Sequence, residues 1–205
     1  MFRILGRSSS INVRKVLWTA AETGVAFTHE DEWGGTRGLH GPEFLALNPN
    51  GQVPVLVTRY GPLWESNTIC RFLARSAGRT DLLPDEPFAG AEVETWMDWQ
   101  ATDLNAAWRP AFMALVRGHG FEASAVQDSV RTWNALMLLL EQRLERTLAF
   151  VTGPTFTLAD IVLGLSLQRW LLTPMPRPDT PALLTYRSRL QERAAAQAWI
   201  KPDVP

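Results

Sequence analysis

Cysteine is almost absent from this sequence: Cys70 stands alone among 205 residues. A single cysteine cannot form an internal disulfide, and it cannot supply the Cys-X-X-Cys pair of a redox or zinc motif. Residues 1–10, MFRILGRSSS, also lack the long apolar stretch of a signal peptide. We therefore expect a cytoplasmic protein with no disulfide and no metal site, because a reducing compartment suits such a composition.

An excess of charge of one sign is also missing. Twenty Lys and Arg stand against 21 Asp and Glu, which gives a net charge of -1. Such a balance creates no general attraction for nucleic acid or an anionic membrane. No apolar run approaches the ~18 residues needed to cross a bilayer. We expect a globular protein with neither nucleic acid nor membrane as partner, and its nine tryptophans can fill a core or line a small-molecule pocket.

The pattern of the chain changes near residue 80. In residues 1–78, short apolar runs alternate with helical patterns, which predicts the order β-α-β-α-β-β-α. The first two strands are joined by a helix and are therefore expected to be parallel. That helix has one apolar face and Gly24 as its C-terminal cap; the face consists of Val13, Val16, Leu17, Ala20 and Ala21.

Residues 79–87 (RTDLLPDEP) are predicted to be a linker, and residues 88–205 a helical domain. Within it we expect one or two helices over 88–117, one over 124–150 and a last one over 182–198. The helix expected over 124–150 has an apolar stripe that consists of Val130, Trp133, Met137, Leu140, Leu144 and Leu148. Thr157 and Asp160 have the spacing of a capping box at a helix start. The fold class predicted is α/β plus all-α.

The segment NPNGQVPVL places a proline, Pro54, between a turn and an apolar strand. A proline weakens a strand ladder because it lacks an N–H. We predict that the Val53–Pro54 bond is cis. The chain would then turn sharply and present the Val53 N–H and C=O to an extended peptide.

Glu65 and Ser66 follow at the start of the next helix. A helix N-terminus offers free N–H groups and a partial positive charge, which suit a carboxylate. Ser66 adds a hydroxyl, and Glu65 can bind an ammonium group. A peptide site and a site for an amino acid head group are therefore predicted side by side.

With these motifs the chain resembles the soluble glutathione transferases of bacteria. NPNGQVPVL contains the cis-proline position of that family, ESNTICRFLA resembles its γ-glutamyl site, and TLAD resembles its helical capping box. The resemblance covers essentially the whole chain. It implies a thioredoxin-like N-terminal domain followed by an all-helical domain, glutathione as co-substrate, and a homodimer.

The resemblance implies a role for individual residues. The backbone of Val53, next to Pro54, would pair with the cysteinyl part of glutathione, and Glu65 and Ser66 would hold its γ-glutamyl group. The residues implied at the glycyl end are Gln52 and one or both of the loop residues His40 and Trp33. A solvent-exposed histidine and a packed tryptophan are the alternative interpretations of these last two.

The family activates the thiol with a tyrosine, serine or cysteine after the first strand. In this chain the corresponding stretch, GRSSSINVRKVLW, contains neither tyrosine nor cysteine. The resemblance places Ser10 at the activating position and Asn12 two residues on, a spacing similar to bacterial transferases of the beta-to-nu neighbourhood. Ser8 and Ser9 are alternatives. Any of these serines can instead cap the helix.

A pocket for the second substrate is expected from the helical domain. Trp108, Arg109, Phe112 and Met113 lie at helical spacing, although core packing explains them equally well. An arginine among aromatic residues suggests an anionic or planar polar group on the substrate. Pro110 is predicted to kink or break this helix.

The sequence therefore predicts a glutathione transferase that acts on an apolar or aromatic electrophile. A glutathione-dependent peroxide or disulfide reductase and a non-catalytic binding or regulatory protein are the alternatives. An isomerase like the zeta relatives ranks last, because SSSIN departs from their SSCS-like signature.

Overall fold

A computed structural model describes residues 1–200. Its internal contacts divide the chain into two units, Met1–Asp85 and Glu86–Pro205. The division falls inside the segment 79–87. The helical domain expected over 88–205 extends into residues 201–205, which lie outside the described residues.

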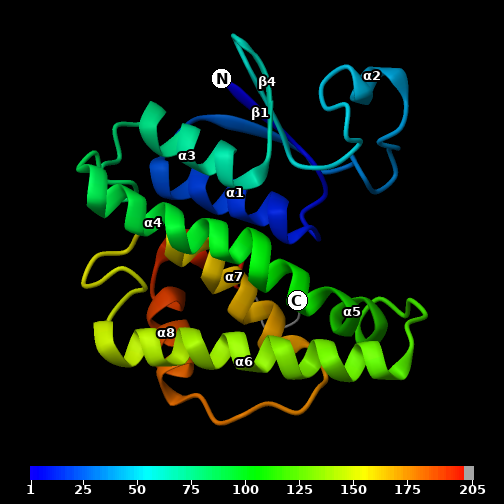
Figure 1. Cartoon of the computed structure of the whole chain (residues 1–205). Helices are drawn as coiled ribbons and strands as arrows, with labels where there is room; N and C mark the ends of the chain where they lie inside the picture. The colour runs from blue at the N-terminus through cyan, green and yellow to red at the C-terminus, as the bar shows by residue number, and fades with distance from the viewer. Residues whose placement is uncertain (201–205) are drawn as a thin grey trace. The chain divides into compact units, whose positions relative to one another are not determined.

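The N-terminal unit has the predicted order of elements (Figure 1). They are β1 (Phe2–Leu5), α1 (Ile11–Thr23), β2 (Phe27–Glu30), α2 (Pro42–Leu45), β3 (Val55–Thr58), β4 (Gly61–Trp64) and α3 (Ser66–Ser76). The predicted β-α-β-α-β-β-α arrangement is confirmed. Gly24 caps α1 with a left-handed φ of 67°, also as predicted.

The four strands form one sheet in the order β2-β1-β3-β4. β1 and β2 are parallel, which confirms the prediction, whereas β3 runs antiparallel to both β1 and β4. Leu5 of β1 and Val55 of β3 pack with Trp33 and with Phe44 of α2. Phe44 therefore fixes the short helix α2 to the sheet face to which Leu5 and Val55 point.

The second unit is helical. Its elements are α4 (Pro87–Trp99), a π-helical turn η1 (Gln100–Leu104), α5 (Asn105–Leu115), α6 (Ala123–Thr147), α7 (Leu158–Leu172), α8 (Pro181–Gln191) and the 3-10 turn η2 (Ala194–Ala196). The last helix is shorter than predicted, since α8 ends at Gln191. Leu148 does not join the buried stripe of α6: it takes a left-handed conformation after the helix ends and is 76% exposed.

Pro110 does not break its helix, so of the predicted kink or break the break is wrong. α5 continues from Asn105 to Leu115 with Pro110 inside it. A proline ring disturbs the bonding of the preceding turn. Here the Ser129 hydroxyl of α6 donates to the Ala107 carbonyl (2.5 Å) and accepts from the Ala111 N–H (3.0 Å). A side chain from the neighbouring helix therefore satisfies backbone groups on both sides of the proline.

The start of α7 contains a buried carboxylate. The Thr157 N–H donates to Asp160 Oδ2 (2.8 Å), which confirms the capping box. The Val151 N–H and the Tyr186 hydroxyl both donate to Oδ1, at 2.9 Å. Burial nevertheless raises the pKa of the Asp160 carboxyl to about 6, and these hydrogen bonds only partly oppose that effect. One side chain thus joins α7, α8 and the loop before α7.

We predict how the stability of this protein changes with pH at Asp160. Because the folded-state pKa lies above the usual 3.8, the folded state binds this proton more tightly than the unfolded chain. The stabilisation is complete below about pH 4 and is lost as pH rises to about 6, with a limit on the order of 3 kcal/mol. Urea unfolding followed by tryptophan fluorescence between pH 4 and 7 measures this slope.

Asp160→Asn is the comparison, because its side chain does not titrate. It should lower the free energy of unfolding at every pH, since the amide nitrogen cannot accept the same bonds. It should also remove the Asp160 part of the downward slope between about pH 4 and 6. Identical slopes in the natural chain and in Asp160→Asn would contradict the prediction.

Candidate functional site

The N-terminus of α1 presents the candidate catalytic groups. Ser10 occupies the N-cap position in an extended conformation, with φ −84° and ψ 124°, but its side chain makes no capping hydrogen bond. Asn12 follows in the first turn and is half-buried. The Ser10 hydroxyl is therefore not used for capping, which removes the structural alternative for this residue.

Ser8 and Ser9 differ from Ser10 in their surroundings. The Ser8 N–H donates to Asp31 Oδ1 (2.6 Å), and the Ser8 side chain also bonds to this carboxylate. Together these bonds hold the pKa of Asp31 below its usual range. Ser9 is exposed. Ser10 and Asn12 are the candidates that lie at the helix start itself, Ser10 as the N-cap and Asn12 in the first turn.

The Val53–Pro54 bond is cis, as predicted. Val53 lies against the end of β1, where Gly6 has a φ of +140°. A Cβ on Gly6 would lie 2.7 Å from Val53 Cβ and 2.6 Å from Val13 Cγ2 of α1. The missing side chain of Gly6 therefore allows the segment before β3 to approach the start of α1.

The backbone of Val53, next to Pro54, is available to pair with a ligand. Within the described part of the chain, neither its N–H nor its C=O takes part in a hydrogen bond. Unpaired backbone groups beside a sheet can pair with an added extended peptide. This arrangement supports the backbone site that the motif predicts.

Glu65 stands in a strained conformation at the N-cap of α3. Its φ of 71° and ψ of 109° lie outside the ordinary region for a residue with a side chain. Such strain costs on the order of 1–3 kcal/mol and is concentrated at functional sites. Glu65 itself is exposed, whereas Ser66 is buried at the first position of the helix. The strained residue therefore belongs to the pair, Glu65 and Ser66, that the sequence predicts as a binding site.

The turn before Val53 is fixed by Asn48. Its side-chain amide donates to the Gln52 carbonyl (2.8 Å), and Gln52 keeps an exposed side chain. His40 is also exposed, and its ring lies against Gly51: a Cβ there would be 2.8 Å from His40 Nδ1. The structure therefore brings His40 and Gln52 together at one turn.

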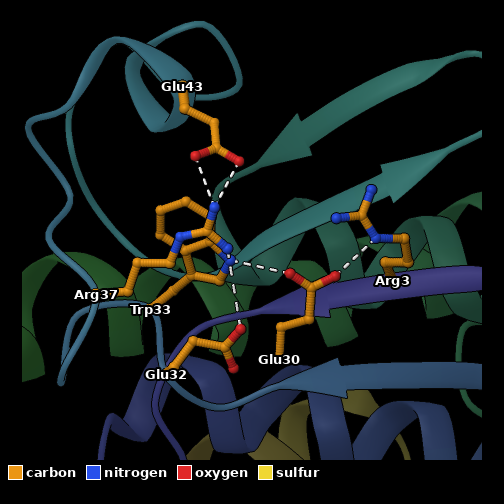
Figure 2. Close-up of polar contacts among 6 residues, drawn as sticks. All are labelled: Arg3, Glu30, Glu32, Trp33, Arg37 and Glu43. Carbon is orange, nitrogen blue, oxygen red and sulfur yellow. Dashed lines mark hydrogen bonds and ion pairs between the residues drawn. The ribbon is translucent and has the colours of Figure 1, made fainter.

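Trp33 is placed differently. It is buried, and its Nε1–H donates to Glu30 Oε2 (3.0 Å), while the Arg37 guanidinium covers its ring at 3.7 Å (Figure 2). Arg37 is itself held by both carboxylate oxygens of Glu43 at 2.6 Å. The geometry favours the packed-tryptophan interpretation, with Trp33 as part of the scaffold.

The four candidates for a second-substrate pocket share one helix, α5. Phe112 is buried and meets the half-buried Trp108 edge to face, with ring centroids 5.3 Å apart. The arginine among these rings is Arg169 of α7. Its guanidinium carbon lies 4.1 Å from the Phe112 ring centroid and 4.4 Å from that of Trp108. Arg109, by contrast, is exposed. Met113 is half-buried.

Sequence reasoning missed Arg169. The residue lies in the otherwise apolar helix LADIVLGLSLQRWLL and is buried. A charged residue within such a run is a signal that could have found it, because buried arginines need partners. His29 and Asp31 were missed as well. They gave no signal in the sequence, because the residues that they contact, Gly6 for His29 and Ser8 for Asp31, lie 23 positions earlier in the chain.

Metal-binding clusters and membrane-spanning helices are both absent from residues 1–200. Over residues 1–200, no group of three or more His, Cys, Asp or Glu side chains is arranged to hold a metal ion. No helix there is long and apolar enough to cross a membrane. Cys70 is fully buried, and burial raises the pKa of its thiol to about 11. It is therefore a packed thiol rather than a nucleophile.

Comparisons with known proteins agree with this geometry. Residues 9–76 match the family model "Glutathione S-transferase, N-terminal domain". Glutathione S-transferase GstB of Escherichia coli K12 is 36% identical over 206 aligned positions, which cover 96% of each chain. The glutathione-bound crystal structure of a theta class glutathione S-transferase from Xanthomonas axonopodis pv. citri superposes with a TM-score of 0.91. It is 33% identical and is covered to 99%, as this chain is to 100%.

Part of the chain also resembles a protein of another kind. A probable elongation factor 1-gamma 2 of Arabidopsis thaliana is 33% identical over 69% of this chain. Only 34% of that protein is covered.

We predict that Gly6→Ala destabilises the N-terminal unit by about 3 kcal/mol or more. The added Cβ would overlap both Val13 and Val53 and would hold a disfavoured φ. Gly24→Ala is the matched control: Gly24 also has a positive φ, but its Cβ would meet nothing within 4 Å. The control should cost only about 1 kcal/mol. Equal losses in the two variants, measured by urea unfolding, would show that the close approach at Gly6 is unimportant.

Proposed function

Since the chain belongs to the glutathione S-transferase family, we propose that its N-terminal unit binds glutathione and that Ser10 and Asn12 activate the thiol. The family assignment confirms the resemblance drawn from the motifs, the expected fold class, and the expected activity of a glutathione transferase with glutathione as co-substrate. The roles of individual residues, the electrophile and the assembly are our proposals.

In the proposed site, glutathione lies along the open backbone of Val53 beside Pro54. The Ser66 hydroxyl and the N-terminus of α3 bind the γ-glutamyl carboxylate, and Glu65 binds its ammonium group. Gln52 and His40 contact the glycyl end, while Trp33 supports the loop from within.

Ser10 and Asn12 supply the chemistry. A free thiol has a pKa near 8.5, and the thiolate is the nucleophile. A hydroxyl from Ser10 and an amide N–H from Asn12 can both donate to the sulfur and so favour the charged form. A hydrogen bond to a charged acceptor contributes roughly 1.5–3 kcal/mol. Two of them suffice to lower the thiol pKa by about two units, which corresponds to ~2.7 kcal/mol.

The single observation that carries this proposal is the Ser10 hydroxyl. Ser10 stands at the N-cap of α1 yet forms no capping bond. N-cap serines ordinarily bond to the helix backbone, which makes an uncommitted hydroxyl at this position unusual. Gly6 links the start of α1 to Val53 through a close approach. A donor and a peptide-binding backbone therefore come together within one unit.

The test compares Ser10→Ala with the natural chain by titrating the ultraviolet absorbance of bound thiolate against pH. Ser10→Ala should raise the pKa of bound glutathione by about one unit and lower kcat/KM at neutral pH about tenfold. Its glutathione affinity should change little, and the defect should shrink at high pH, where the thiol ionises unaided. Asn12→Ala should act in the same direction, and the double variant should be worse.

The matched control is Glu65→Ala combined with Ser66→Ala. By calorimetry this variant should raise the Kd of glutathione more than tenfold while leaving the pKa of the bound thiol unchanged. An unshifted titration in Ser10→Ala would remove Ser10 from its role. It would point to Ser9, Asn12 or the backbone instead, whereas an absence of conjugation, peroxide and disulfide activity would favour a non-catalytic glutathione-binding protein.

For the electrophile we propose an apolar or aromatic compound that meets the aromatic group of the helical unit. Trp108 and Phe112 are the aromatic residues of that group and Met113 adds an apolar thioether, with Arg109 at the exposed side of the same helix. Activity screens against aromatic halides, peroxides and disulfides separate a transferase from a glutathione-dependent reductase.

We also propose a cytoplasmic homodimer. Tyr60 and Phe88, one in each unit, are 79% and 74% exposed. Side chains exposed singly in this way are normal on a monomer surface, so the dimer rests on the family membership, and the lone buried Cys70 agrees with a reducing compartment. Light scattering should find twice the chain mass of 23.0 kDa. A species of 23.0 kDa at micromolar concentration would contradict the dimer.

A further inference from the structure

The segment that carries Ser10 is anchored to the end of β2 and the residues after it. The Gly6 N–H donates to the Glu30 carbonyl (3.0 Å), and the Arg7 N–H donates to the Trp33 carbonyl (2.9 Å). Trp33 is fixed in turn by Glu30 and Arg37, as Figure 2 shows. The residues that anchor the segment, Glu30 and Trp33, are thus held in place by contacts of their own.

Two side chains complete this anchor. Asp31 Oδ1 accepts the Ser8 N–H at 2.6 Å, and His29 Nε2 bonds to the Gly6 carbonyl at 2.7 Å. His29 Nε2 and Asp31 Oδ1 lie 3.7 Å apart. The Ser10 N–H closes the segment by donating to the Arg7 carbonyl (3.0 Å). The hydrogen bond between Ser10 and Arg7 closes a turn over residues 7–10, and Asp31 binds this turn at Ser8.

We propose that Asp31 is a positioning residue for the transferase reaction: by holding the Ser8 N–H, it fixes the turn whose last residue, Ser10, presents its hydroxyl to the glutathione sulfur. This inference rests on the proposed role of Ser10. Asp31 itself touches neither substrate nor sulfur in this scheme. Its effect reaches the reaction only through the backbone between Ser8 and Ser10.

The sign of the thiol pKa shift separates positioning from a charge effect. Removing a carboxylate near a thiolate removes like-charge repulsion, and so lowers the thiol pKa. Removing the anchor of Ser10 misplaces a donor to the thiolate, and so raises the thiol pKa. Asp31 is ionised at neutral pH, and the hydrogen bonds from Ser8 hold its pKa below the usual range. The two roles therefore predict opposite shifts for one substitution.

The experiment uses the full-length protein with glutathione and an aromatic halide. Asp31→Ala should raise the pKa of bound thiol by about one unit and lower kcat/KM at neutral pH five- to tenfold, with glutathione Kd within threefold of the natural value. Asp31→Asn keeps an oxygen that can accept the Ser8 N–H, and should retain activity within threefold. Glu32→Ala is the matched charge control, because Glu32 is exposed and forms an ion pair with Arg37 at 4.0 Å. It should behave like the natural chain.

A double-mutant cycle makes the test specific. In a Ser10→Ala background, Asp31→Ala should cause less than a twofold further loss, because the hydroxyl it positions is gone. Fully multiplicative losses, a lowered thiol pKa, or equal behaviour of Asp31→Ala and Glu32→Ala would each overturn the inference. If Asp31→Ala does not fold, Asp31→Ser, with a side chain too short to span to Ser8, repeats the cycle. A loss in Ser10→Ala with none in Asp31→Ala refutes only the positioning role, whereas no loss in Ser10→Ala refutes the proposed function itself.

Discussion

The close approach at Gly6 is the constraint on which the N-terminal unit depends. β1 ends at Leu5, and the chain must then turn toward α1 while Val53 packs against the same point. Any side chain at Gly6 would occupy the space of Val13 and Val53. The absence of one atom therefore lets a helix start and an open backbone segment share a site. In our proposal, this contact brings the start of α1, with Ser10 and Asn12, close to the Val53 backbone.

Around that point, the loop residues are held by neighbours rather than by their own secondary structure. The Glu30 carboxylate accepts hydrogen bonds from the Arg3 guanidinium (2.7 Å) and the Trp33 indole N–H. The carbonyls of Glu30, at the end of β2, and of Trp33, in the loop after it, accept the N–H groups of Gly6 and Arg7. Hydrogen bonds to ionised groups are the stronger ones. The N-terminal unit thus combines these supporting hydrogen bonds with one strained residue, Glu65.

In the helical unit, side chains form hydrogen bonds with backbone groups that the helices leave without partners. Ser129 of α6 satisfies backbone groups around Pro110, and Glu141 of α6 accepts the N–H groups of Ala182 and Leu183 at the start of α8, at 2.8 and 2.7 Å. Asp160 does the same for the start of α7. Buried helix ends and proline turns leave backbone groups without partners, and each such group is costly unless bonded. These three contacts keep the irregular parts of the unit in a single arrangement.

The sequence by itself determined the order of elements, the Gly24 cap, the capping box at Thr157 and Asp160, and the segment around Pro54, because each depends on residues close together in the chain. It could not determine that Pro110 stays within its helix, since Ser129 lies 19 positions away. Nor could it show that Asp31 holds Ser8 while the Ser10 side chain makes no capping bond, or that Trp33 is packed. Only the tertiary structure decided these points, because the partners that commit Ser8 and Trp33, and leave Ser10 available, come from Asp31, Glu30 and Arg37 on a neighbouring strand and its loop.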